Sequence, residues 1–247
     1  MISVAIGGRT LAVSVFLFWL SNAACVAEVI RITHNQPFPP LSELKNGKSE
    51  GLLIDVLRAA SARVGLELEF VAAPLDQMEQ TLKDGRADAF LTAMTPERLK
   101  SYDFSAPVAT TGGALFVRVP NTTPENLLAM SGKVVVTPRP GPLADLIART
   151  APTVKLLLTA NYEQSLAHVI EGAADAAALN YHAGTVIAAR LYPGQITMPR
   201  VMFQETVNAV ATPKGHRSEF LARLSQGLDA IRADNTWTEI NRRWIGP

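Results

Sequence analysis

The sequence has one cysteine, almost no net charge and no signature of two common enzyme classes. Its 247 residues include 23 Lys and Arg against 22 Asp and Glu, for a formal net charge of +1. Because no run of Lys and Arg with interleaved aromatic residues occurs, we predict that nucleic acid is not a partner. The His-Glu-x-x-His motif of zinc proteases and the phosphate loop of nucleotide-binding proteins are also missing.

The N-terminal segment, residues 1–27, is typical of a secretory signal. Arg9 precedes the uncharged stretch TLAVSVFLFWLSNAACVA, whose apolar centre is too short for a transmembrane helix and which ends in small residues. We predict cleavage after Ala27 and a periplasmic location. Cys25 leaves open a lipoprotein signal, in which an acylated cysteine begins the mature chain. Asn22, however, stands where such signals usually have an aliphatic residue.

A mature chain that begins at Glu28 has no cysteine and is electrically balanced, because removing Arg9 leaves 22 basic and 22 acidic residues. Disulfides cannot stabilise such a chain in an oxidising compartment, so a packed core must do so. The 48% apolar content allows such a core. His34, His168 and His216 have no mutual spacing that indicates a metal site, and no cofactor is predicted.

Strand-like and helix-like segments alternate in the first half of the chain. Segments rich in β-branched or alternating apolar residues predict strands at 29–35, 66–73 and 87–93. Apolar residues at helical spacing predict helices between them, at 51–65 and 76–85. This order is typical of a mostly parallel sheet with helices on its faces.

The same order returns after the break VPNTTPEN. Three strands and two helices are predicted in alternation, at 133–139, 142–150, 154–160, 162–172 and 174–179. The repetition indicates two related α/β units.

The motif Gly-x-Ala-Asp-Ala occurs at the same point of both halves. Gly85 and Gly172 are expected to end the preceding helices, because glycine readily adopts the left-handed conformation of a helix C-cap. Asp88 and Asp175 fall early in the third strand of each half. We expect a turn or packing role for them rather than catalysis.

The rest of the chain predicts a helix at 182–193, strands at 196–203 and 205–213, and helices at 217–234 and 236–244. In open α/β sheets, ligands bind beyond the carboxyl ends of the strands. With two such units, the natural binding site is the cleft between them.

Four stretches carry a resemblance to one family: GLLIDVLRAAS, GRADAFLTAMTPERLKSYDFSAPV, YEQSLAHVIEGAADAAAL and LDAIRADNTWTEINRRWIG. They resemble the extracytoplasmic solute-binding proteins of ATP-driven importers, in particular those that bind polar amino acids. The resemblance implies an α/β, two-lobe periplasmic binding protein (type II, Venus-flytrap) fold with two hinge strands, ALFVRV and TVNAVA. It places one lobe at 28–115 plus 208–247 and the other at 116–207.

The resemblance also implies a function. The chain is expected to be a monomer that captures a small carboxylate-bearing ligand, an amino acid or a related organic acid, and delivers it to an inner-membrane ABC permease. No catalytic residue is expected.

Arg98 is the first candidate for the site. In the resembling family the arginine of this motif binds a ligand α-carboxylate, and a guanidinium offers paired donors that match a carboxylate. The alternative is a surface ion pair with Glu97 or Asp103. Thr92 and Thr95 precede Arg98 and are expected to complete the anion site; otherwise Thr92 packs in the core and Thr95 caps the next helix.

Three further candidates come from loops. Phe38 falls where members of the family have an aromatic residue that covers the ligand, although core packing is the alternative. Asn35 ends the first strand and can bind the ligand or stabilise its own turn. Gly141 opens the helix that starts near Pro142, where free N–H groups attract anions beside Arg139, but Pro142 itself lacks a donor.

Asn180 stands where amino-acid binders of the family commonly have an Asp that pairs with the ligand ammonium, and Leu53 replaces another frequently acidic position. A neutral amide lacks the charge that strengthens such hydrogen bonds. The hypothesis is therefore a ligand that keeps a carboxylate but has no free α-ammonium. Tyr181 follows at the same cleft edge and can face the ligand, as can His182 unless it caps its helix.

Two other functions stay open. Cyclohexadienyl dehydratases are enzymes on this fold and need a general acid in the cleft, yet no Asp or Glu occurs between Asp175 and Glu205. Only His182 or Glu205 could replace it. The other alternative is a periplasmic accessory protein of a quinoprotein dehydrogenase, which the sequence does not distinguish from a transport component.

Overall fold

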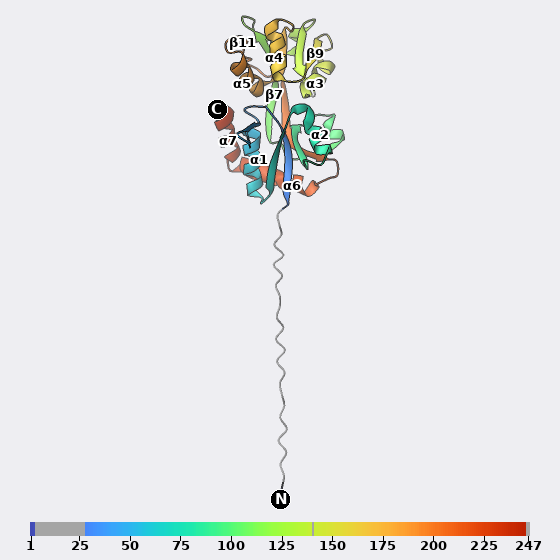
Figure 1. Ribbon diagram of the computed structural model, residues 1–247, viewed down its shortest axis with the longest axis vertical. Coiled ribbons are helices and arrows are strands. Elements are labelled where there is room, and N and C mark those ends of the chain that lie inside the picture. The colour runs from blue at the N-terminus through green and yellow to red at the C-terminus, as the bar shows by residue number, and fades with distance from the viewer. Residues whose placement is uncertain (3–27, 140, 246–247) are drawn as a thin grey trace.

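The computed structural model describes residues 1–2, 28–139 and 141–245. The predicted signal segment, with Cys25 and the cleavage point, lies outside the described residues except for residues 1–2. Figure 1 shows two lobes stacked on one another, with β7 running between them. None of the described helices has the length and hydropathy needed to cross a membrane.

The lower lobe in Figure 1 is built on three parallel strands in the order β4-β1-β5. Its main elements are β1 (Val29–Asn35), α1 (Leu52–Arg63), β4 (Glu67–Ala73), α2 (Met78–Lys83), β5 (Ala89–Ala93), α6 (Ser218–Ala233) and α7 (Thr236–Ile245). Shorter elements are β2 (Glu43–Lys45), β3 (Lys48–Glu50), η1 (Leu75–Gln77), η2 (Arg98–Lys100) and β6 (Tyr102–Phe104).

The upper lobe repeats the plan with parallel strands in the order β10-β8-β9. Its elements are η3 (Leu127–Met130), β8 (Val134–Pro138), α3 (Pro142–Thr150), β9 (Lys155–Thr159), α4 (Tyr162–Glu171), β10 (Ala176–Asn180), α5 (Tyr181–Leu191) and β11 (Ile196–Thr197). The strand predicted at 196–203 is wrong in length, because only two residues pair. Pro199 lies within the predicted segment and has no N–H to donate to a ladder.

Two long antiparallel strands, β7 (Ala109–Arg118) and β12 (Gln204–Pro213), join the lobes; we call them the hinge strands. β12 pairs with β5 of the lower lobe, and β7 pairs with β10 of the upper lobe. One mixed sheet therefore runs through the whole molecule. Both predicted lobe boundaries, at 115/116 and 207/208, fall inside these two strands.

Each half of the sheet is covered on both faces, so its central strands are apolar on both sides. In β5, Leu91 packs into the cluster under α1 and α6, while Phe90 packs into the cluster with α2. In β10, Leu179 faces the α4 and α5 cluster and Ala178 faces the α3 cluster. This alternation follows from the two-residue period of a strand.

The repeated motif has the same structural role in both lobes. The N–H of Asp88 donates to the Arg31 carbonyl at 2.8 Å, and its carboxylate accepts the Arg31 N–H at 3.0 Å. Asp175 makes the same two bonds with Val134, at 2.9 and 2.7 Å. Each aspartate thus joins the third strand of its lobe to the first, which confirms the expected packing role.

The two aspartates differ in their surroundings. Asp88 is 13% exposed and also binds the guanidinium groups of Arg31 and Arg217. Burial alone would raise the pKa of the Asp88 carboxyl, but the hydrogen bonds from Arg31 and the charge of Arg217 hold it below its ordinary value. Asp175 is 43% exposed, and among the described residues its one ionic partner is Lys133, at 3.8 Å.

We predict that Asp88→Asn lowers the free energy of unfolding by about 1.5–3 kcal/mol, because an amide cannot accept bonds from both guanidinium groups. Urea unfolding at neutral pH measures the change. Asp175→Asn is the matched control and should cost clearly less, since its amide oxygen can still accept the Val134 N–H. Equal losses in the two variants would contradict the assignment.

Candidate functional site

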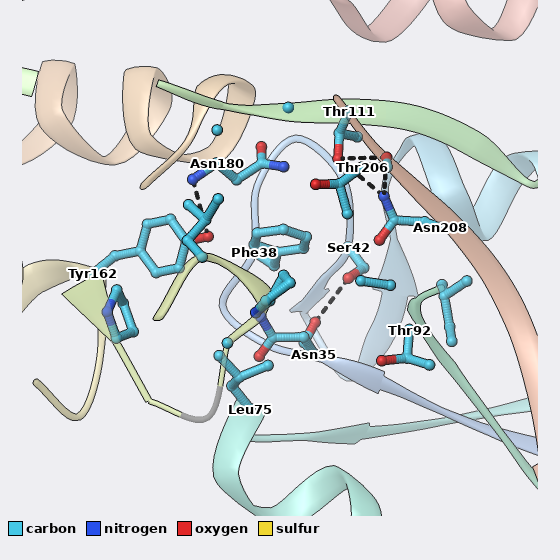
Figure 2. A pocket seen from close by; sticks show the side chains of 18 of the residues that line it. Asn35, Phe38, Ser42, Leu75, Thr92, Thr111, Tyr162, Asn180, Thr206 and Asn208 are labelled. Carbon is cyan, nitrogen blue, oxygen red and sulfur yellow. Dashed lines mark hydrogen bonds between the residues drawn. The ribbon is translucent and has the colours of Figure 1, made fainter. Parts of the chain in front are cut away.

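A pocket lies between the lobes and is lined by residues of both (Figure 2). The ends of β1, β5, β8 and β10 reach it, as do the start of α3 and both hinge strands. Six of the eight predicted site residues line it: Asn35, Phe38, Thr92, Arg98, Gly141 and Asn180. In an α/β unit each helix starts near the carboxyl end of the strand before it. The carboxyl ends of the parallel strands therefore lie at one edge of the sheet, and the pocket lies at this edge.

The other two predicted residues, Thr95 and Tyr181, lie outside the lining. Thr95 Oγ1 accepts the Arg98 N–H at 3.3 Å, so the threonine closes the turn that leads into η2. Tyr181 packs against the apolar cluster of α4 and α5, and its ring lies 5.1 Å from that of His182. Both side chains therefore contact their own lobe.

Arg98 lines the pocket from the start of η2 and is half-buried. Its Nη1 donates to the Ala93 carbonyl at 3.2 Å, which directs the guanidinium along the end of β5. No carboxylate of the described residues lies within ion-pair distance of it. A guanidinium has five N–H donors, and the bond to Ala93 is the one that the Arg98 side chain makes within the described part of the chain.

Neither surface pairing considered for Arg98 is present in the structure. Glu97 forms an ion pair with Arg149 of the upper lobe instead. Asp103 accepts the N–H of Gly215 at 2.7 Å. Burial lowers the pKa of Arg98, but an arginine starts so far above neutrality that it stays charged. The pocket therefore contains a guanidinium group that has no carboxylate partner in the described chain.

A polar cluster on the hinge strands also lines the pocket. Asn208 Nδ2 donates to Thr111 Oγ1 at 2.9 Å, and Thr111 Oγ1 lies 3.5 Å from the Thr206 carbonyl. These bonds join β7 to β12 and fix the Asn208 amide (Figure 2). Sequence reasoning missed all three residues. The sequence feature that could have identified them is the presence of polar residues inside otherwise apolar strand segments.

An aromatic pair closes part of the pocket across the lobes. The Phe38 ring meets the Tyr162 ring edge-on, with centroids 5.9 Å apart. Tyr162 begins α4, and its hydroxyl accepts the N–H of Asn180 at 3.4 Å. Burial raises the pKa of Tyr162, so it stays neutral at physiological pH. Tyr162 is another pocket residue that the sequence analysis did not single out.

Asn180 has two roles at the junction of β10 and α5. Its Oδ1 accepts the Ala183 N–H at 3.2 Å and caps the helix, which is a common role of asparagine. Its amide nitrogen has no hydrogen-bond partner within the described part of the chain and the residue lines the pocket. Gly141 caps α3 from an extended conformation, while Arg139 is exposed and is not part of the lining.

A second hollow, here called the side hollow, lies beside the pocket. Its acidic residues are Glu97, Asp145 and Glu205, and Arg149 is its basic residue. Glu205 and His182, the two possible general acids, are both outside the pocket lining. Among the described residues, no group of three or more His, Cys, Asp or Glu side chains is placed to hold a metal ion.

Residues 47–51 match Gly-x-Ser-x-Gly, a pattern that presents the nucleophile in α/β-hydrolases. Here Ser49 is 6% exposed and lies outside the pocket lining. Its Oγ is 2.8 Å from Nε2 of the fully buried His34, whose Nδ1 is 3.1 Å from the Asn35 carbonyl. A carbonyl only accepts, so Nδ1 carries the proton and Nε2 accepts from Ser49. The pair supports the loop before α1 and has no access to a substrate.

Comparisons with known proteins agree with this architecture. A sequence model of the bacterial extracellular solute-binding proteins, family 3, matches residues 30–247. A "Probable amino-acid ABC transporter-binding protein" of Haemophilus influenzae is 26% identical over 208 residues, which are 82% of this chain and 78% of that protein.

Two solved structures have similar folds. A histidine kinase sensor domain similar to periplasmic binding proteins superposes with a TM-score of 0.80 at 24% identity, over 89% of this chain and 97% of that one. An ancestral arginine-binding protein bound to glutamine gives a TM-score of 0.77 at 24% identity, over 89% and 98%. These likenesses show the two-lobe Venus-flytrap fold.

The buried His34 predicts a pH dependence of stability. Burial lowers its pKa below the ordinary value of 6.5, so the unfolded chain binds this proton more tightly than the folded one. The free energy of unfolding must then fall as the pH drops below the pKa that His34 has in the unfolded chain. Urea unfolding at about pH 7.5 and about pH 5.5 should show this loss, and His34→Gln should reduce it.

His182 provides an independent comparison, because burial lowers its pKa as well but it lies in α5 of the upper lobe, with its ring beside Tyr181. His182→Gln should reduce the acid loss by a separate and additive amount. An acid loss that is unchanged in His34→Gln would show that His34 does not titrate as described.

Proposed function

The chain belongs to the bacterial extracellular solute-binding proteins, family 3, and on that premise we propose that it captures a small carboxylate-bearing ligand between its lobes in the periplasm. The ligand class is an amino acid or a related organic acid, and the recipient is an inner-membrane ABC permease. The protein acts as a monomer, with one lobe at 28–115 plus 208–247 and the other at 116–207.

The observation that carries this proposal is the Arg98 guanidinium, half-buried in the pocket and without a carboxylate partner in the described chain. A buried charge without a counter-ion is unfavourable. A ligand carboxylate relieves this cost and gains charge-assisted hydrogen bonds. Asn35 and Thr92, on neighbouring strand ends, and Gly141, at the start of α3, complete the polar surroundings of the anion.

Ligand contacts with both lobes favour the closed arrangement. Phe38 comes from the lower lobe, and Asn180 and Tyr162 come from the upper lobe. A ligand shifts a conformational equilibrium only by its differential affinity for the two states. Contacts that require both lobes provide that difference, so capture and closure are coupled, and the closed form is what a permease recognises.

Binding, rather than catalysis, agrees with the side chains of the pocket. The two residues considered as a general acid, His182 and Glu205, do not line it. Ser49, the serine of the hydrolase-like pattern, is buried against His34. No residue of the described lining is therefore proposed as catalytic.

We predict that Arg98→Ala weakens carboxylate binding by about 1.5–3 kcal/mol, the range for hydrogen bonds to charged groups, with folding intact. A thermal-shift screen against amino acids, deaminated carboxylates, amines and aromatic acids identifies the ligand, and calorimetry measures the loss. Arg139→Ala is the control, because this exposed arginine lies near the start of α3 but outside the lining.

Equal affinity in the wild type and Arg98→Ala would remove Arg98 from the site. Silence of the whole screen with a well-folded protein would contradict the proposal and favour the accessory role in a dehydrogenase system.

A further inference from the structure

The formal charge in the described pocket lining is positive, with no negative charge to balance it. Arg98 is the only charged side chain of the described lining, which contains no Asp and no Glu. Residues 3–27, 140 and 246–247, which are outside the described part, contain no Asp or Glu either. No Asp or Glu side chain therefore lines the pocket among the described residues.

The carboxylates nearest to Arg98 are directed elsewhere. Glu79 accepts a hydrogen bond from the Tyr102 hydroxyl at 2.8 Å and pairs with Lys83 at 3.0 Å. Glu97 pairs with Arg149. Asp145 and Glu205 belong to the side hollow. The charges of Glu79 and Asp145 favour the charged form of Arg98, but none of these carboxylates is part of the pocket lining.

Some neutral polar groups of the pocket are engaged with the protein. Ser42 Oγ donates to the Asn35 carbonyl at 2.8 Å, and Thr137 Oγ1 donates to the Ala178 carbonyl at 2.7 Å. The Asn180 oxygen caps α5, which leaves its amide nitrogen, a donor, on the pocket side. An ammonium group would find only neutral acceptors in the described lining, such as the side-chain oxygens of Asn35 and Thr92, while Asn180 offers it a donor.

The ammonium group of an amino acid in this pocket would lie near a like charge, and no side chain of the described lining would provide a negative charge for it. Burial of such a group is costly unless an opposite charge compensates it. A carboxylate has the opposite balance, because Arg98 and the Asn180 amide both donate. The rest of the lining is largely apolar, with Leu53, Leu75, Met78 and Leu143 beside the Phe38 and Tyr162 rings.

We infer that the ligand is a monocarboxylate without an ammonium group and with an apolar or uncharged body, and that Asn180 is the residue that selects against the ammonium. This inference rests on the proposed function, since it assumes that Arg98 binds a carboxylate. It narrows the ligand class from amino acids and related acids to the deaminated acids.

The test uses pairs of ligands that differ only in the ammonium group. Calorimetry of the purified protein compares L-leucine with 4-methylpentanoate, L-phenylalanine with 3-phenylpropanoate, and L-glutamine with 4-carbamoylbutanoate. In each pair that binds, the deaminated acid should bind at least about tenfold more tightly, which is about 1.4 kcal/mol. The affinity ratio within a pair cancels effects common to both members.

Asn180→Asp then places a carboxylate in the pocket without removing the helix cap, because Asp caps helices as well as Asn does. The affinity ratio should shift toward the amino acid by about tenfold or more. Asn180→Ser is the matched control, since it also caps but brings no charge, and its ratio should stay that of the wild type.

Each outcome is decisive. An amino acid that binds the wild type more tightly than its deaminated partner, or a ratio that Asn180→Asp leaves unchanged, overturns this inference but leaves the carboxylate receptor intact. If no member of any pair binds, and the wider carboxylate screen is silent as well, the proposed function fails and the inference fails with it.

Discussion

The pairing of the hinge strands is the constraint on which the rest of the structure depends. β7 and β12 pair from Gln204 with Gly113 to Asn208 with Ala109, and each also pairs with a strand of one lobe. This arrangement makes one sheet out of two independently covered halves. It also sets the register of Thr111, Thr206 and Asn208, so the same ladder that joins the lobes supplies a polar surface to the pocket.

The hinge strands can carry this surface because the lobes are stabilised elsewhere. Each lobe has its own apolar clusters on both faces of its sheet, and each has an aspartate that joins its third strand to its first. The pocket lies at the strand ends, outside these clusters. A polar or unpaired group there does not interrupt the apolar clusters, so the desolvation cost of Arg98 falls on the pocket and not on either core.

The sequence predicted most of the fold because the signals were local. Strand and helix periods, the caps at Gly85 and Gly172, and the repeat around Asp88 and Asp175 all depend on neighbouring residues. The strand at 196–203 was overestimated because its apolar residues gave a strand-like pattern while Pro199 interrupts pairing. Pattern alone does not say which strand residues find a partner.

The site was predicted in part for the same reason. Thr92 and Asn180 lie at the ends of β5 and β10, and Arg98 lies a few residues after β5, where the α/β plan itself places ligands. Tyr162 and Asn208 were missed because their local sequence does not show that they face the pocket. Tyr162 resembles a core aromatic, and a polar residue inside an apolar strand, such as Asn208, can also bond within the sheet. Their place in the pocket arises only when the lobes meet and when β12 takes its register beside β7.

Asn180 shows how specificity can change without a change of fold. The start of α5 requires a side chain that accepts the Ala183 N–H, and Ser, Thr, Asn and Asp are the residues that do this well. Only Asp among these four brings a charge. A single substitution at a position that the helix already restricts thus decides whether the pocket is electrically neutral or positive. In the inferred binding mode, the charge of the ligand is selected by a residue that also caps α5, while Arg98 on the other lobe stays the same.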